Sequence, residues 1–67
     1  MAVAKTVFDV LDDRIAKAIH DNEDFVTSGG AKTLEGYREA CGVIRGLALA
    51  RRELQDLAKN YMEQNDD

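Results

Sequence analysis

The chain has 67 residues, of which 45% are hydrophobic and 33% are charged, and its formal net charge is -4. This length allows one domain with a thin core, because a chain of about 60 residues buries only about 60% of the surface that it exposes when unfolded. The single Cys excludes an internal disulfide, the lone Cys and His exclude a Cys/His metal cluster, and the charged fraction excludes a membrane span. Small folds usually need a disulfide, a metal or a partner subunit, so we expect another subunit to complete this one.

The first predicted element is an amphipathic helix over residues 3–23. At 100° per residue, apolar side chains share one half of its helical wheel and charged side chains share the other. Thr6 and Asp9 have the spacing of a capping box, so the helix is expected to begin at Thr6 rather than at Ala2. Acidic residues crowd the other end, where the helix dipole disfavours them, and we expect the helix to stop or fray near residues 22–24.

Residues 24–33 form the predicted turn. This stretch contains two neighbouring glycines and several hydroxyl side chains, which are typical of a turn. Phe25 and Val26 are expected to fold back over the end of the hairpin. Thr33 is expected to cap the helix that follows.

A second amphipathic helix is predicted over residues 34–64, because this stretch lacks a strong helix breaker and its apolar residues recur at heptad spacing. Two helices joined by a short turn pack antiparallel, and no stretch of the chain shows the alternation of a strand. We therefore predict an all-α fold with a single domain over residues 1–67. It is an antiparallel two-helix hairpin with a longer second helix, completed by oligomerisation or by packing on a partner.

The second predicted helix must overhang the first, since at 1.5 Å per residue it is about 15 Å longer. In the pairing that the predicted turn implies, Ile19 lies near Cys41 and Leu11 lies near Ala48. The C-terminal apolar residues are then left without a partner in their own chain. These residues are Leu57, Ala58, Tyr61 and Met62. Such a stripe indicates contact with another subunit, and fraying of this end is the simpler alternative.

Gly42 and Gly46 have the spacing of two small residues on one helix face, and Leu49 lies in the same patch. Each glycine costs about 1 kcal/mol relative to Ala inside a helix. We interpret the pair as a place where a second helix or a partner's loop approaches the backbone closely. The alternative is that these glycines have no role.

Four basic residues at seven-residue spacing form a stripe along one rim of the apolar face. They are Arg38, Arg45, Arg52 and Lys59. Arg51 instead projects from the middle of the apolar face, where its stem can cover apolar surface while its head stays in water. The alternative is a charge-assisted hydrogen bond from Arg51 to a carboxylate of another chain.

We expect no enzymatic activity, no cofactor and no metal. Residues 28–33 lack the glycine spacing of a phosphate-binding loop, and a two-helix hairpin offers no pocket of catalytic size. His20 is expected to face solvent, whereas Cys41 is expected to face the core. The two side chains are therefore not expected to form a nucleophilic pair. Direct binding of nucleic acid is disfavoured by the net charge, although residues 36–52 are locally basic.

The Ser-Gly-Gly-Ala-Lys turn at 28–32, the stretch at 37–50 with its Cys-Gly-Val-Ile-Arg-Gly-Leu core, and residues 53–57 resemble a family of short proteins encoded by tailed bacteriophages. The resemblance is to podoviruses of the T7 type in particular, and it covers roughly the C-terminal 40 residues. Genes of this family lie near the portal and head–tail structural genes and have no assigned biochemical activity. The resemblance therefore implies a virion component or assembly factor, and it transfers no catalytic residue.

We therefore expect a small bacteriophage structural or assembly protein that docks through its second helix on the portal, the head–tail connector or the capsid. Its expected location is the virion or the cytoplasm of the infected host, and its expected partner is a phage structural protein or a second copy of itself. No small-molecule substrate and no membrane are expected. The expected partner-binding residues are Gly42, Gly46, Leu49, Arg38, Arg45, Arg51, Arg52, Leu57, Tyr61 and Met62.

Two alternatives belong to other classes. One is a non-virion phage regulator that inhibits a host protein by mimicking nucleic acid with an acidic face of the first helix. The residues of that face are Asp9, Asp12, Asp13, Asp21, Glu23 and Asp24. The other is a self-assembling helical bundle that has no further partner.

Overall fold

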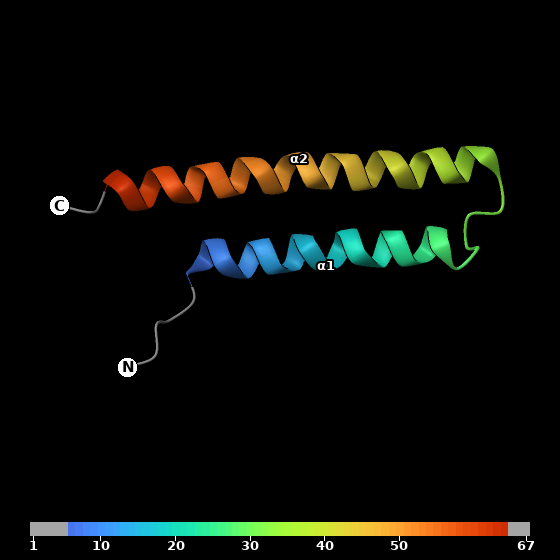
Figure 1. Cartoon of the computed structure of the whole chain (residues 1–67), viewed down its shortest axis with the longest axis horizontal. Coiled ribbons are helices and arrows are strands. Elements are labelled where there is room, and N and C mark those ends of the chain that lie inside the picture. Colours follow the sequence, from blue (N-terminus) through green and yellow to red (C-terminus); the bar gives the residue numbers. More distant parts are fainter. Residues whose placement is uncertain (1–5, 65–67) are drawn as a thin grey trace.

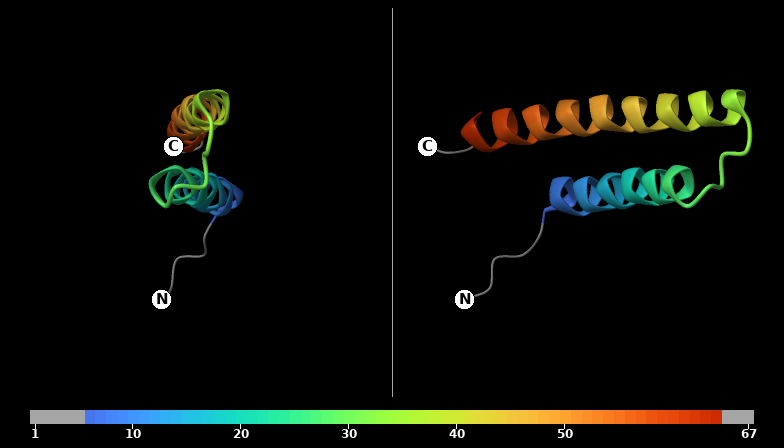
Figure 2. Two further views of the ribbon diagram at one scale, coloured as in Figure 1. Left: turned by 90° about the vertical axis from the view of Figure 1, so that its right-hand side faces the viewer. Right: turned by 45° about the vertical axis from the view of Figure 1, so that its right-hand side comes forward.

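The computed structural model describes residues 6–64, and these residues form two α-helices (Figure 1). Helix α1 comprises Val7–Thr27 and helix α2 comprises Leu34–Gln64. The turn between them reverses the chain, so the helices lie side by side and antiparallel, and α2 extends beyond α1 at the end away from the turn (Figures 1 and 2). The described part of the chain contains no strand. The predicted all-α hairpin with a longer second helix is confirmed.

The start of α1 is set by the capping box that the sequence predicts. Thr6 is the N-cap, and its Oγ1 accepts a hydrogen bond of 3.2 Å from the backbone N–H of Asp9. In return, the Asp9 carboxylate accepts a hydrogen bond of 3.2 Å from the backbone N–H of Thr6. Both N–H groups would otherwise lack a partner within the helix. The remaining residues of the predicted segment, 3–5, lie outside the described residues.

At its other end α1 continues to Thr27, so the prediction that it ends near residues 22–24 is wrong. The reason is contact with the second helix. Asn22 and Phe25 line a hollow together with Ala40 and other residues of α2, and Val26 is half-buried. Each exposed carboxylate near a helix C-terminus costs about 0.3–1 kcal/mol, which is less than one further turn of apolar contact contributes.

The turn depends on two glycines and one cap. Gly29 has a φ of +85°, a region that glycine adopts without steric cost. Gly30 approaches Phe25 closely: its N–H donates a 2.8 Å hydrogen bond to the Phe25 carbonyl oxygen, and a Cβ at Gly30 would meet the Phe25 ring. Phe25 lies in the last helical turn of α1, and its ring therefore packs against the loop that joins the two helices. The predicted cap of α2 is present, since the Thr33 Oγ1 accepts a hydrogen bond of 3.0 Å from the Gly36 N–H.

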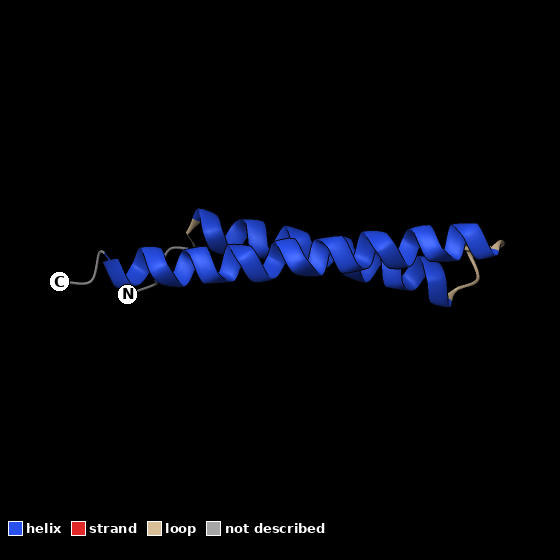
Figure 3. Ribbon diagram, turned by 90° about the horizontal axis from the view of Figure 1, so that it is seen from above, coloured by secondary structure: helices blue, strands red, loops and turns tan. Residues whose placement is uncertain are grey.

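The two helices meet along a seam of residues spaced alternately by three and four positions. This spacing keeps one stripe of each helix facing the other. In α1 the seam comprises Phe8, Asp12, Ile15, Ile19, Asn22 and Val26, and in α2 it comprises Ala40, Ile44, Leu47, Arg51, Leu54 and Ala58. The core is thin: among the described residues only Ala40 is buried, with 6% of its surface exposed. Figure 3 shows that the helices cross near their middle and diverge towards their ends.

The pairing along the seam differs from the predicted pairing by one to two helical turns or more. Asp12 contacts Arg51 and Gln55, and the ring centroid of Phe8 lies 5.5 Å from that of Tyr61. The prediction of a turn at residues 24–33 would have placed these α1 residues against earlier positions of α2. Since α1 continues to Thr27, its additional residues shift the pairing away from the turn.

Candidate functional site

The outward side of α2 carries a patch in which the backbone is open to solvent. Gly42 and Gly46 are exposed, and no heavy atom lies within 4 Å of a Cβ built on either glycine. Leu49 lies in the same patch and exposes 59% of its surface. We call these three residues the docking surface. Nothing in the described hairpin requires a glycine at positions 42 or 46, although both weaken the helix.

A basic stripe borders the docking surface. Arg38, Arg45, Arg52 and Lys59 are all exposed, and none of their side chains makes a hydrogen bond or an ion pair within residues 6–64. Seven residues of helix rise by about 10.5 Å, so the stripe presents one positive charge at each such interval. A surface of this kind favours a partner that carries carboxylates, because rim charges steer association and fix the relative position of two helices.

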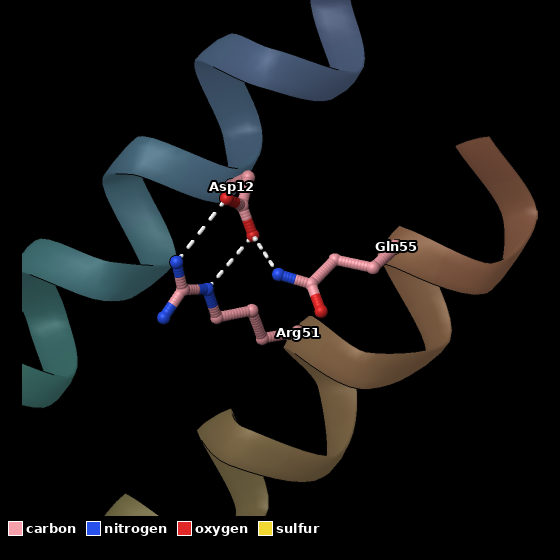
Figure 4. Close-up of polar contacts among 3 residues, drawn as sticks. All are labelled: Asp12, Arg51 and Gln55. Atoms are coloured by element: carbon pink, nitrogen blue, oxygen red, sulfur yellow. Dashed lines mark hydrogen bonds and ion pairs between the residues drawn. The ribbon is translucent and has the colours of Figure 1, made fainter. Parts of the chain in front are cut away.

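Arg51 does not belong to the outward surface. Its Nε donates a hydrogen bond of 2.8 Å to Oδ1 of Asp12, and its Nη2 donates one of 3.3 Å to Oδ2 (Figure 4). The Gln55 side-chain amide adds a hydrogen bond of 3.3 Å to Asp12 Oδ1. The prediction of Arg51 as a partner-binding residue is therefore corrected, because its guanidinium is bound by a carboxylate of its own chain.

Sequence reasoning missed Asp12 because it grouped all carboxylates of the first helix on the solvent side. The signal was present: Asp12 lies four residues after Phe8 and three before Ile15, which is the spacing of the seam. The hydrogen bond from Arg51 lowers the pKa of Asp12 below its ordinary value, and the burial of the carboxylate opposes this only in part. The same pair raises the pKa of Arg51.

The C-terminal apolar residues are divided between two environments. The Tyr61 ring packs on Phe8 with an interplanar angle of 50°, and Ala58 is half-buried in the seam. The prediction that these two residues lack a partner in their own chain is therefore wrong, and the shifted pairing of the helices is the reason. Leu57 and Met62 are exposed as predicted. Met62 and Tyr61 border an open hollow of about 340 Å³ beside the start of α1.

No group of three or more His, Cys, Asp or Glu side chains within residues 6–64 could hold a metal ion. His20 is exposed, with its Nδ1 3.6 Å from Oε1 of Glu23, whereas Cys41 is a free thiol at the half-buried edge of the seam. Neither described helix is long and apolar enough to cross a membrane.

Comparisons with protein-family models, with curated proteins and with solved structures give no match for this chain.

Proposed function

We propose that the protein is a small structural or assembly protein of a tailed bacteriophage, and that it docks through the outward side of α2 on the portal, the head–tail connector or the capsid. The observation that carries this proposal is the exposed docking surface, in which Gly42 and Gly46 leave the helix backbone uncovered beside Leu49. The resemblance of the turn and of α2 to phage proteins supports the class of partner.

The docking surface suits a partner helix or loop that approaches α2 closely. Packed helices normally lie about 8–10 Å apart, and glycines at four-residue spacing allow a shorter separation with more backbone contact. Leu49 supplies an apolar side chain for a hollow of the partner, and it is already exposed. Arg45 has no carboxylate three or four residues away on its own helix, so it is available to an acidic group of the partner.

A repeated assembly suits a hairpin with so little core. Each copy would bury a modest surface, and a symmetric ring or shell multiplies that contact over many identical positions. Burial against a larger protein would also add to a seam in which, among the described residues, only Ala40 is buried. Contacts within an assembly would therefore supply burial that the thin core of the hairpin does not provide.

The test compares two variants that place a new Leu on the same side of α2. Gly46→Leu fills the docking surface, whereas Asn60→Leu lies fourteen residues further along the helix and outside it. Quantitative mass spectrometry of purified phage particles measures how many copies of each variant are incorporated. We expect Gly46→Leu to reduce the copy number about tenfold or more and Asn60→Leu to leave it unchanged. Incorporation of both variants at the wild-type level would contradict docking at this surface.

The regulator remains the second candidate because α1 presents a row of carboxylates to solvent. Asp9, Asp13, Asp21, Glu23 and Asp24 are exposed, but Asp12 is not part of this row, since Arg51 binds it in the seam. This candidate predicts that the wild-type protein is missing from purified particles. It also predicts that replacing the five exposed acids by their amides abolishes any growth inhibition caused by expressing the protein in the host.

A further inference from the structure

A second apolar surface runs along one side of the hairpin and draws on both helices. Its residues flank the seam at seven-residue spacing, and we call them the side face. They are Leu11, Ala18 and Phe25 of α1 and Val43, Ala50 and Leu57 of α2. The two rows lie on the same side, because Phe25 and Val43 line one hollow beside the seam. Each large side chain of this face is exposed.

We propose that a second copy of this chain covers the side face, with a two-fold axis parallel to the helices, so that α1 of each copy lies on α2 of the other in a four-helix bundle. This goes beyond the proposed function, because it assigns a surface other than the docking surface and names its occupant. Interfaces of this symmetry use the same patch on both copies. The side face is complementary to itself in the size and the charge of its residues.

The first ground is the order of large and small residues along the face. A two-fold axis parallel to the helices exchanges α1 and α2 but keeps every residue at its level along the hairpin. Leu11 then lies near Leu57 of the second copy at one end, and Phe25 lies near Val43 at the turn end. Ala18 and Ala50 fall between them. Large residues therefore meet at both ends, and small residues lie where the helices must approach most closely.

The second ground is charge. Arg14 and Glu53 lie on the outer rim of the side face, one on each helix, and neither side chain makes a hydrogen bond or an ion pair within residues 6–64. Arg14 lies two residues after Asp12, and Glu53 lies two residues after Arg51. Because the helices run in opposite directions, these steps of about 3 Å add, and the two residues lie about 6 Å apart along the hairpin axis. Two long side chains span such a distance. In the bundle, Arg14 of each copy faces Glu53 of the other. The two copies are therefore joined by two ion pairs.

The test is sedimentation equilibrium of the full chain from micromolar to submillimolar concentration. We expect a dimer for the wild type. Leu57→Asn should raise the dissociation constant about tenfold or more, because an apolar side chain is lost from both halves of the interface. Leu49→Asn is the matched control, since Leu49 and Leu57 expose 59% and 58% of their surfaces on the same helix. It should leave the dissociation constant unchanged.

A charge exchange tests the position of the axis and does not require the removal of an apolar residue. Arg14→Glu alone and Glu53→Arg alone should each weaken the dimer, and the double variant should restore it. A monomer at every concentration, or equal weakening by both Leu variants, overturns the assignment of the side face. Failure of the double variant to restore the dimer overturns the axis. Incorporation into particles is measured separately, so a failed dimer and a failed docking role are distinguished.

Discussion

At the scale of single residues, the Asp12–Arg51 pair has the most specific role in the hairpin. It is a two-point contact between side chains 39 positions apart in the chain, and it lies in the seam among apolar neighbours. An apolar pair would allow the two helices to slide past one another, whereas a forked guanidinium on a carboxylate is satisfied at one position only. The contact between Asp12 and Arg51 therefore favours one position of α1 along α2.

This pair makes the stability of the hairpin depend on pH. The folded-state pKa of Asp12 lies below its ordinary value of 3.8, so its contribution to stability is complete above about pH 5 and is lost as the pH falls through the lowered pKa. We expect Asp12→Asn to lower the thermal unfolding midpoint at neutral pH, and we expect the difference from the wild type to shrink below about pH 4. Circular dichroism across this range measures both midpoints.

The control for this prediction is Asp24→Asn, since the Asp24 carboxylate makes no hydrogen bond or ion pair within the described residues. Its midpoint should lie at or slightly above that of the wild type at neutral pH, because the helix dipole disfavours a carboxylate in the last turn of α1, and it should not fall below the wild type at any pH. A constant difference between wild type and Asp12→Asn from neutral to acidic pH would show that the charge of Asp12 does not stabilise the fold.

At the scale of the elements, the sequence predicts what is local and fails where distant contacts decide. The Thr6–Asp9 box and the Thr33 cap each join residues three positions apart, and both are present as predicted. The end of α1 was misplaced because its acidic residues suggested an early stop, whereas contact with α2 extends the helix to Thr27. The partner of Arg51 was missed for the same reason.

The docking surface itself was predicted from glycine spacing, and the structure places both glycines in the open. A Cβ at Gly42 or Gly46 meets no atom, so Gly42→Ala and Gly46→Ala should each raise stability by about 1 kcal/mol. For a domain of this size that corresponds to about 4–8 °C in the unfolding midpoint. If close approach of the partner needs these glycines, the same variants should be incorporated less well into particles.

The matched control is Gly36→Ala. A Cβ there would lie 3.1 Å from Oγ1 of Thr33, which caps α2, so the gain in stability should be smaller or absent. Calorimetry on the three single variants gives the comparison. If Gly42→Ala and Gly46→Ala destabilise the protein, these glycines are needed within the hairpin and their presence no longer argues for a partner.

At the scale of the whole molecule, the hairpin is a rod rather than a globule. At 1.5 Å per residue, the 31 residues of α2 make the hairpin about 46 Å long, whereas its width is that of two packed helices, about 20 Å. A rod of two helices has only one internal contact surface, so apolar residues outside the seam remain exposed. The docking surface and the side face are the two places where we propose that neighbours supply the missing burial.

Thermal unfolding of the isolated wild-type protein as a function of its concentration shows whether a neighbour completes this chain. Association with the folded state raises the unfolding midpoint by mass action. We expect the midpoint to rise steadily with protein concentration. A midpoint that stays high and constant as the concentration is varied, for a protein that sediments as a monomer, would contradict it.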